Sequence, residues 1–434
     1  MLALSVVVFG HSFVGMTRRT PVVPTSAQPT QPHHPETTSI SEGFDPALSV
    51  MAVRPPIYPV STYAFRTAEE AAHHFDVALG RAERAGGEDL GLIYARLNNP
   101  NAEMFEDALS SVERGAIGAV ALGSGMAAIA TVALALLQPG QVILYQRPIY
   151  GGTDHLFHHV LPQWKVEAIA VKDDGWDVAL AEYGTRIGMV YLETPGNPTL
   201  HMIDIAAIVD ALQRASIKAP VVVDNTFLGP VFQAPLTLGA DLCVYSATKF
   251  LGGHSDLVAG AVTGRDTALI QKVKVMRAFL GTICEPFTAW LLQRSMATLH
   301  LRMIKQSKNA AKLVEVLKKH PAVLKVHHPS QFEGEQREVY SRQCSAPGSM
   351  IAIEVAGGRE GAFKFMNALS LFRIAVSLGG VESLATHPRT TTASEMSGDD
   401  LRLSGITEGL VRLSIGVEYW RDQARDLTQA LDQV

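Results

Sequence analysis

Lys249 is the residue of this chain whose surroundings most favour covalent chemistry. It lies in the stretch VYSATKFLGGHSDLVAG, residues 244–260, among small hydroxyl residues and before a pair of glycines. Desolvation at such a place lowers the pKa of an amine towards that of a usable nucleophile. A lysine of this kind can form a Schiff base. The alternative is a lysine whose stem packs and whose head reaches solvent.

Two groups that precede Lys249 in the chain fit the same chemistry. Asp224 ends the apolar run of VVVDNTF, where a buried carboxylate must face a cation such as a protonated ring nitrogen; a cap on the following turn is the alternative. Residues 123–126 of LGSGMAAIA separate a strand from a helix, which makes them an anion site or a simple tight turn. An anion site, an acid and an amine are the three groups that pyridoxal 5′-phosphate requires.

Two more residues suit a flat cofactor. Tyr150, in RPIYGGT, offers an aromatic face for stacking, and Asn197, in ETPGNPT, is an amide that can donate to a phenolate oxygen. A different class of enzyme, a cofactor-free aldolase-like protein, would need only Lys249. That alternative leaves Asp224 and the glycine turn without a role.

An α/β fold would place these residues together. From about residue 115, short apolar runs alternate with helix-like segments, which predicts a large, mostly parallel sheet with helices on both faces. Loops at the carboxyl ends of such strands line the site. One long amphipathic helix is expected to begin near residue 287 and to end at the proline of HPAVLKVHHP. Beyond residue 330, strand and helix patterns predict a smaller C-terminal α+β domain.

Composition narrows the class of protein. The 434 residues are 47% hydrophobic and 18% charged, with a net charge of −5, so we expect a globular protein with a small-molecule partner and no nucleic acid. Three widely spaced cysteines indicate a reducing, cytoplasmic location without a zinc site, and no metal is expected. The apolar opening is too short to span a membrane, although a signal peptide is an alternative. Residues 1–45 are expected to be a disordered extension.

Seven stretches together resemble one known family, the Cys/Met metabolism enzymes that use pyridoxal phosphate. In chain order they are YARLNNPN, ALGSGMAAI, ETPGNPT, DNTFLGP, YSATKFLGGHSD, SLGGVESLATHP and ITEGLVRLSIGVE. The family includes cystathionine γ-synthase, cystathionine γ-lyase, methionine γ-lyase and O-acetylhomoserine sulfhydrylase. The resemblance covers roughly residues 40 to 430 and implies a fold-type I pyridoxal-phosphate enzyme. It implies a segment 46–100 that contacts a neighbouring subunit, a cofactor domain 101–290 and a small domain 291–434.

The resemblance also implies roles for single residues. Lys249 would bind the cofactor covalently and shuttle protons, Asp224 would pair with the pyridine nitrogen, and Tyr150 would stack on the ring and act as an acid. The expected phosphate and ring contacts are Gly125, Met126, Asn197, Thr226, Ser246 and Thr248. Arg412 would bind the substrate carboxylate with support from Ser377. Tyr94 and Arg96 would reach the cofactor of the neighbouring subunit, which implies a homotetramer built from two dimers.

The substrate is predicted from fewer residues. Val376, which precedes Ser377, stands where members that handle cystathionine usually carry a glutamate, and an apolar residue suits a thioether. We therefore expect γ-elimination of methionine-like substrates to a thiol, ammonia and 2-oxobutanoate. Gly152, where well-studied methionine γ-lyases carry cysteine, counts against this, so γ-replacement and transsulfuration stay open. Arg389 is expected to add a cation near the substrate mouth. A non-catalytic binding module is disfavoured because Lys249, Asp224 and Arg412 are all present.

Overall fold

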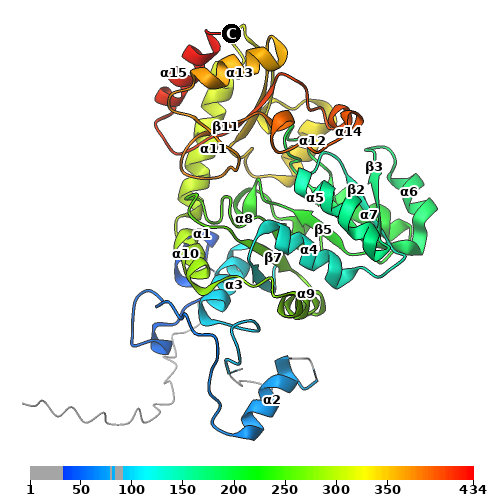
Figure 1. Cartoon of the computed structure of the whole chain (residues 1–434), viewed down its shortest axis with the longest axis vertical. Coiled ribbons are helices and arrows are strands. Elements are labelled where there is room, and N and C mark those ends of the chain that lie inside the picture. Colours follow the sequence, from blue (N-terminus) through cyan, green and yellow to red (C-terminus); the bar gives the residue numbers. More distant parts are fainter. Residues whose placement is uncertain (1–32, 79–80, 84–90) are drawn as a thin grey trace, which may run out of the picture.

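The computed structural model describes residues 33–78, 81–83 and 91–434, and its larger domain is built on a seven-stranded sheet (Figure 1). The strand order is β1-β7-β6-β5-β4-β2-β3, and only β7 runs antiparallel to its neighbours. This confirms the predicted mostly parallel sheet. The strands are β1 (Gly118–Leu122), β2 (Val142–Gln146), β3 (Glu167–Val171), β4 (Ile187–Glu193), β5 (Val221–Asp224), β6 (Leu242–Tyr245) and β7 (Gly260–Gly264).

Helices cover both faces of this sheet because successive strand residues point to opposite sides. Val190 and Leu192 of β4 pack on one face, whereas Met189 and Tyr191 pack on the other. The first face carries α3 (Pro100–Val112), α6 (Trp176–Tyr183), α7 (Ile205–Arg214), α8 (Gly229–Phe232) and α10 (Pro286–Met296). The second carries α4 (Gly125–Leu136), α5 (Gly151–His155) with the turn after it, and α9 (Thr267–Leu280).

The smaller domain has a separate sheet and core. Its strand order is β10-β11-β12-β9-β8, antiparallel except for β10 with β11. Its strands are β8 (Val323–His327), β9 (Met350–Val355), β10 (Arg373–Ile374), β11 (Leu384–Thr386) and β12 (Leu410–Ser414). Its helices are α11 (Leu299–Leu317), α12 (Gly334–Gln343), α13 (Gly358–Ala368), α14 (Gly398–Leu403) and α15 (Trp420–Leu431). Helix α11 runs from the large domain into this one (Figure 1).

The single long helix expected from residue 287 is wrong, because the chain forms α10 and α11 with a break between them. Thr298 leaves the helical conformation at φ −117° and ψ 7°. Arg302 fills the break: its Nε donates to Thr298 Oγ1 at 3.1 Å, and its NH2 donates to the Ser295 carbonyl at 3.0 Å. An amphipathic period does not reveal such a break, since both helices keep their apolar residues on the core side.

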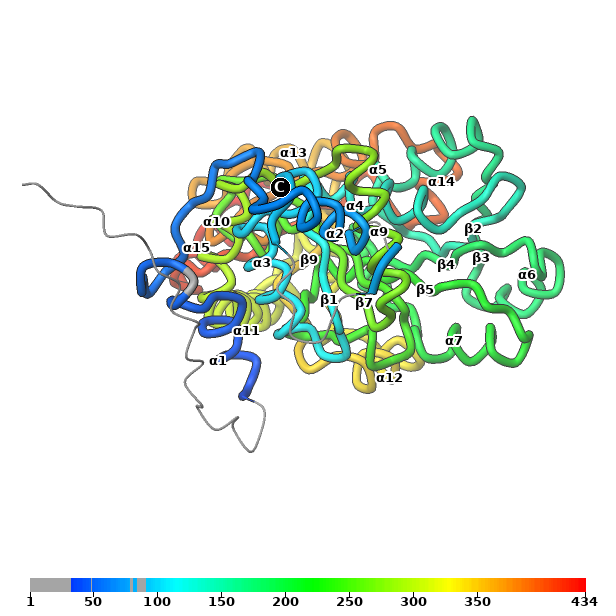
Figure 2. Tube along the Cα trace, turned by 90° about the horizontal axis from the view of Figure 1, so that it is seen from below, coloured from blue at the N-terminus to red at the C-terminus, as the bar shows by residue number. Residues whose placement is uncertain are grey.

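The expectation of disorder through residue 45 does not hold for Pro35–Ser41, which forms α1. Proline opens this helix and the His34 side chain accepts from the Glu36 N–H at 3.3 Å. Helix α1 packs on α3, at the end of the large domain opposite α6 in both views (Figure 1, Figure 2). The rest of the expected extension up to residue 32 lies outside the described residues. Helix α2 (Ala68–Ala78) follows. Across the described ranges, no helix has the length and apolarity needed to cross a membrane.

Candidate active site

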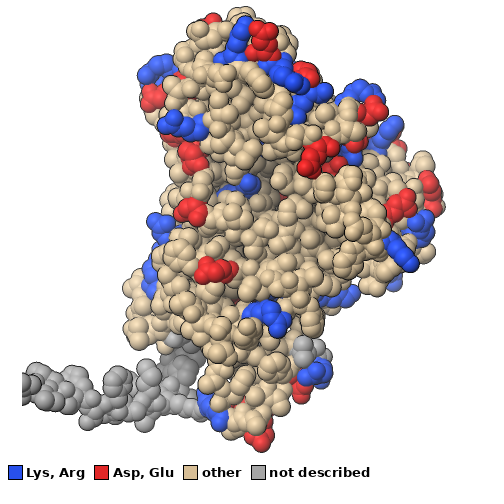
Figure 3. Space-filling view, viewed as in Figure 1, with Lys and Arg blue, Asp and Glu red and all other residues tan. Residues whose placement is uncertain are grey.

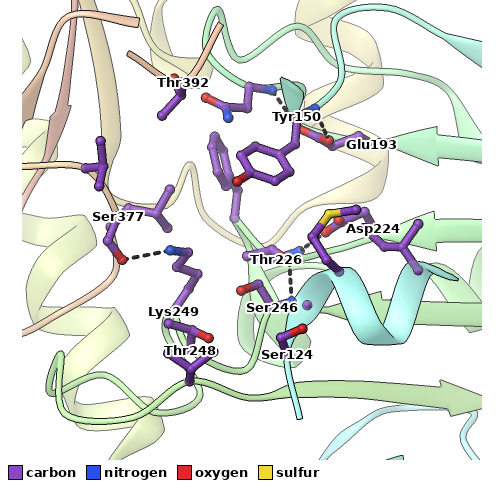
Figure 4. A pocket seen from close by; sticks show the side chains of 18 of the residues that line it. Ser124, Tyr150, Glu193, Asp224, Thr226, Ser246, Thr248, Lys249, Ser377 and Thr392 are labelled. Atoms are coloured by element: carbon purple, nitrogen blue, oxygen red, sulfur yellow. Dashed lines mark hydrogen bonds between the residues drawn. The ribbon is translucent and has the colours of Figure 1, made fainter. Parts of the chain in front are cut away.

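A cavity of about 320 Å³ lies at the carboxyl ends of β4, β5 and β6, where the small domain meets the large one. The surface is hollowed between the two domains at this place (Figure 3), and Figure 4 shows side chains from both domains facing the cavity. The cavity brings together most of the residues singled out from the sequence. These are Gly125, Met126, Tyr150, Asn197, Asp224, Thr226, Ser246, Thr248, Lys249, Ser377 and Arg412.

Lys249 enters the cavity from the turn that follows β6. Its backbone N–H donates to the Ser246 carbonyl at 3.0 Å, and its Nζ donates to Ser377 Oγ at 2.7 Å (Figure 4). Burial lowers the pKa of this amine to about 8, and the nearby Arg412 cation adds to the effect. The amine is therefore deprotonated far more readily than an exposed lysine.

Asp224 ends β5 and faces the same cavity. Its Oδ2 accepts from the Tyr191 hydroxyl at 3.2 Å, and its Oδ1 accepts from the Thr226 N–H at 3.0 Å. Burial raises its pKa, because no cation forms an ion pair with it among the described residues. A cation placed in the cavity would stabilise the carboxylate.

The start of α4 supplies the expected anion site. Ser124 caps the helix by accepting the Ala127 N–H at 3.0 Å, and Ser124, Gly125 and Met126 line the cavity. Gly125 allows close approach, since a Cβ there would lie 2.8 Å from the Ser246 Cβ. The Ser246 N–H in turn donates to Thr226 Oγ1 at 2.9 Å. The Thr248 hydroxyl, expected to face a phosphate, instead donates to the Ala259 carbonyl at 3.1 Å.

Arg412 projects into the cavity from β12, on the side formed by the small domain. It is buried, and its two terminal nitrogens donate at 2.9 Å to Asn197 Oδ1 and to the Ser377 carbonyl. Its Nε has no hydrogen-bond partner in the described part of the chain, and burial lowers its pKa to about 10. A buried cation with a free donor is suited to a carboxylate ligand.

The family model described as "Cys/Met metabolism PLP-dependent enzyme" matches residues 36–432. The chain belongs to this family. An L-methionine gamma-lyase of Pseudomonas deceptionensis is 40% identical over 91% of this chain and 96% of its own length. A cystathionine gamma-synthase of Mycobacterium tuberculosis is 37% identical over 92% of this chain and 96% of its own length.

Solved structures agree with this membership. The cystathionine gamma synthase of Xanthomonas oryzae pv. oryzae in complex with cystathionine has a TM-score of 0.84 and 33% identity, covering 93% of this chain and 99% of its own. CalE6, a methionine gamma lyase from Micromonospora echinospora in its apo form, has a TM-score of 0.79 and 34% identity, covering 92% and 99%. The fold-type I architecture predicted from the resemblance is confirmed.

The cofactor of this Cys/Met metabolism enzyme is pyridoxal phosphate, and the cavity fits it. Lys249 provides an amine of lowered pKa, Asp224 a buried carboxylate without a cation, and the start of α4 an anion site next to Ser246. The Tyr150 ring is half exposed and stands at the cavity between Glu193 and Lys249 (Figure 4). These groups are the ones that a phosphate, a protonated pyridine and an aldehyde require.

Sequence reasoning missed Glu193, the last residue of β4. Its Oε2 accepts the Tyr150 N–H at 2.7 Å and its Oε1 accepts the Asn197 N–H at 2.9 Å. Burial and the neighbouring Asp224 raise its pKa to about 8. An acid that ends an apolar strand is the signal that had identified Asp224, and the same signal is present in MVYLE.

Three residues singled out from the sequence do not line this cavity. Arg96 NH1 donates to the Ala278 carbonyl at 2.6 Å, and the Arg96 guanidinium lies 5.8 Å from the centre of the exposed Tyr94 ring. Arg389 Nε lies 2.9 Å from Glu408 Oε1. Arg389 therefore forms an ion pair and does not line the cavity, and a role for it at the substrate mouth stays a prediction.

Proposed function

We propose that this chain eliminates the γ-substituent of methionine-like amino acids and releases a thiol, ammonia and 2-oxobutanoate. The substrate class is inferred from the acidic residues that line the cavity. Its described lining contains two carboxylates, Asp224 and Glu193, and both oxygens of each already accept hydrogen bonds. Val376 takes the place beside Ser377. Both of these acids thus already bind protein groups, and the residue beside Ser377 is apolar, which disfavours the second ammonium group of cystathionine relative to a thioether.

Bound pyridoxal phosphate supplies an electron sink that makes the Cα–H of an amino acid acidic. Under this proposal Lys249 accepts and returns that proton, because burial lowers the pKa of its amine to about 8 and Ser377 orients it. Arg412 binds the substrate carboxylate through its free Nε, and Asp224 keeps the ring nitrogen protonated. Tyr150 stands at the cavity as the acid for the leaving sulfur.

The remaining cofactor contacts belong to the same proposal. Gly125, Met126, Ser246 and Thr248 would hold the phosphate, with Thr226 and Asn197 beside the ring; Thr248 must release Ala259 to do so. Tyr94 and Arg96 would complete the site of a neighbouring subunit. Their exposed position outside their own cavity supports a dimer and, by family resemblance, a homotetramer.

The domain boundaries and the location in the cell are proposed as well. Separate cores support two domains, proposed as a cofactor domain over 101–290 and a small domain over 291–434, although the core of the large domain extends to Met303 of α11. Residues 46–100 are proposed as the segment that contacts the neighbouring subunit. The three cysteines are free in the described structure, as expected of a cytoplasmic protein.

The test offers the purified holoenzyme methionine, cystathionine, homocysteine, or an O-acylhomoserine with a thiol, and measures 2-oxobutanoate and ammonia. We expect release from methionine, and loss of release in Lys249→Ala but not in the exposed Lys308→Ala. The relatives named as cystathionine gamma-synthases support γ-replacement as a second candidate. A new thioether formed from the O-acylhomoserine and the thiol, without 2-oxobutanoate from methionine, would replace our proposal by that candidate. Release of 2-oxobutanoate from cystathionine but not from methionine would overturn the methionine-like substrate class. Full activity of Lys249→Ala would exclude both.

A further inference from the structure

Helix α11 carries three buried polar side chains on the face that meets the active-site loops. Arg302, Gln306 and Asn309 are spaced so that they share one side of the helix, and each is nearly inaccessible to solvent. Burying such groups is costly unless each finds hydrogen-bond partners. All three donate to backbone carbonyls of loops distant in the chain. The helix therefore holds loops in place as well as packing on the core.

Arg302 holds the loop that carries Lys249. Its NH1 donates to the Phe250 carbonyl at 2.7 Å, and its NH2 donates to the Leu251 carbonyl at 3.5 Å. No carboxylate pairs with this guanidinium within the described residues. Gly253, at φ +70°, leaves room for it, since a Cβ there would collide with Arg302 NH1. The Arg302 guanidinium therefore binds the carbonyls of the two residues that directly follow Lys249.

Gln306, one turn further along, holds the loop that carries Ser377. Its Nε2 donates to the Gly380 carbonyl at 2.7 Å. Ser377 itself has φ +83°, a conformation that only surrounding contacts can maintain in a residue with a side chain. The two loops also touch, since a Cβ on Gly379 would lie 2.8 Å from the Phe250 nitrogen. Gly379 therefore permits the close approach of the loops that Arg302 and Gln306 hold.

We propose that Arg302 and Gln306 are positioning residues that set the contact between Lys249 and Ser377. One rigid helix spans the two domains and binds one loop from each, so the relative position of Nζ and Oγ is determined by two side chains four residues apart. The Ser377 carbonyl also accepts a hydrogen bond from Arg412, so the contacts that hold the Ser377 loop also position Arg412. The inference rests on the proposed role of Lys249.

Asn309 provides a matched control on the same helix face. It is equally buried and its Nδ2 donates to the carbonyls of Gly416 at 3.1 Å and Glu418 at 2.8 Å, in a segment after β12 that meets the Ser377 loop only at its far end, where the Val417 N–H donates to the Val381 carbonyl. Changing it to methionine removes two hydrogen bonds from the same environment. It therefore reports what a purely structural loss does to the enzyme.

The experiment compares Arg302→Met, Gln306→Met and Asn309→Met as holoenzymes. For each variant, thermal unfolding, cofactor content, the pH midpoint of the cofactor absorbance, kcat and KM are measured. We expect all three to melt several degrees lower. Only Arg302→Met and Gln306→Met should shift the pH midpoint by at least half a unit and reduce kcat/KM at least tenfold. The kcat/KM of Asn309→Met should stay within twofold of the wild-type value. If Arg302→Met does not fold, Gln306→Met tests the proposal instead. Arg302→Lys, which keeps a cationic donor but not the planar guanidinium, should recover part of the loss.

Two outcomes would overturn the inference: a Gln306→Met enzyme with the wild-type midpoint and kcat/KM, or an Asn309→Met enzyme that is impaired to the same degree. Borohydride reduction of the wild-type holoenzyme, followed by peptide mapping, tests the proposed function separately. Cofactor fixed on a residue other than Lys249 would reject that function. Cofactor on Lys249 together with unaltered variants would reject only the positioning role.

Discussion

The Lys249 amine donates to the Ser377 hydroxyl at 2.7 Å, although 128 residues separate the two in the chain. The lysine belongs to the large domain and the serine to the loop before β11 of the small domain. The contact therefore depends on how the domains meet. It also keeps the amine in a partly desolvated position, where a lowered pKa is expected.

The first prediction concerns the pH at which Lys249 becomes reactive. Since burial and Arg412 lower its pKa from 10.5 to about 8, the neutral amine should dominate above about pH 8. The rate at which cofactor-free protein takes up pyridoxal phosphate should therefore rise with pH, with a midpoint near 8. Stopped-flow absorbance measures this rate. A midpoint near 10.5 would show that the amine is exposed.

Asp224→Asn should lower kcat by about two to four orders of magnitude. Removing one partner from a buried charge pair costs about 3–5 kcal/mol, and each 1.36 kcal/mol is a factor of ten in rate. The amide can still accept the Thr226 N–H, so the fold should survive. Steady-state kinetics and circular dichroism check this. The control variant is Asp210→Asn on the exposed side of α7, whose kcat should equal that of the wild type. Equal kcat values for the two variants would contradict the role of Asp224.

Gly152→Ala should displace the Tyr150 ring. A Cβ at position 152 would lie 2.6 Å from Tyr150 Cε1 and 3.1 Å from Met126 Sδ, so one of the two side chains must move. We expect a changed circular dichroism of the bound cofactor and a fall in kcat of about tenfold or more, equivalent to about 1.4 kcal/mol. Gly398→Ala is the control, because a Cβ there meets nothing within 4 Å. An unchanged spectrum in Gly152→Ala would mean that the ring tolerates the methyl group.

Asp400→Asn should loosen the segment that brings Thr392 to the cavity. Arg147 is nearly buried and pairs with Asp154 of α5 at 2.8 Å and with Asp400 of α14, so it ties the two domains together. Losing this ion pair, whose Asp400 side chain is partly exposed, should cost about 1 kcal/mol of stability and raise KM several-fold. Urea unfolding and kinetics measure the two effects. The adjacent Asp399→Asn, whose side chain is exposed, should change neither; a wild-type KM in Asp400→Asn would argue that Thr392 is held by other contacts.

Glu113→Gln should remove a pH dependence of stability. Burial raises the pKa of Glu113 from 4.5 to about 8, and its Oε1 has no partner in the described structure. Between these values the unfolded chain loses a proton that the folded protein keeps, so the free energy of unfolding falls as pH rises from 4.5 to 8. The variant can still accept the Tyr245 hydroxyl.

Denaturant titrations at pH 5 and pH 8 measure this effect. The wild type should lose on the order of a few kcal/mol relative to Glu113→Gln over the interval, because a tenfold change in proton affinity between the folded and unfolded states corresponds to about 1.36 kcal/mol. Glu315→Gln, on an exposed part of α11, serves as the control. Parallel curves for wild type and Glu113→Gln would show that Glu113 is charged when folded.

Much of the cofactor site could be predicted from local sequence. Lys249, Asp224 and the turn at Gly125 each follow an apolar strand, and parallel strands bring their carboxyl ends to one edge of a sheet. Glu193 carried the same local signal and could have been found. The opening of α4 could be located because serine and glycine are common where a helix begins after a strand, although a simple tight turn was the alternative.

Other features depended on contacts between distant segments. The ion pair of Arg389 with Glu408 joins segments 19 residues apart, and at the break before α11 Arg302 binds the carbonyls of Ser295 and Phe250. The sequence alone determined the residue types at the strand ends and hence the cofactor chemistry, because backbone periodicity and turn formation are local. Only the tertiary structure decided which buried polar side chains pair, because hydrogen bonds require distances near 3 Å between groups that are far apart in the chain.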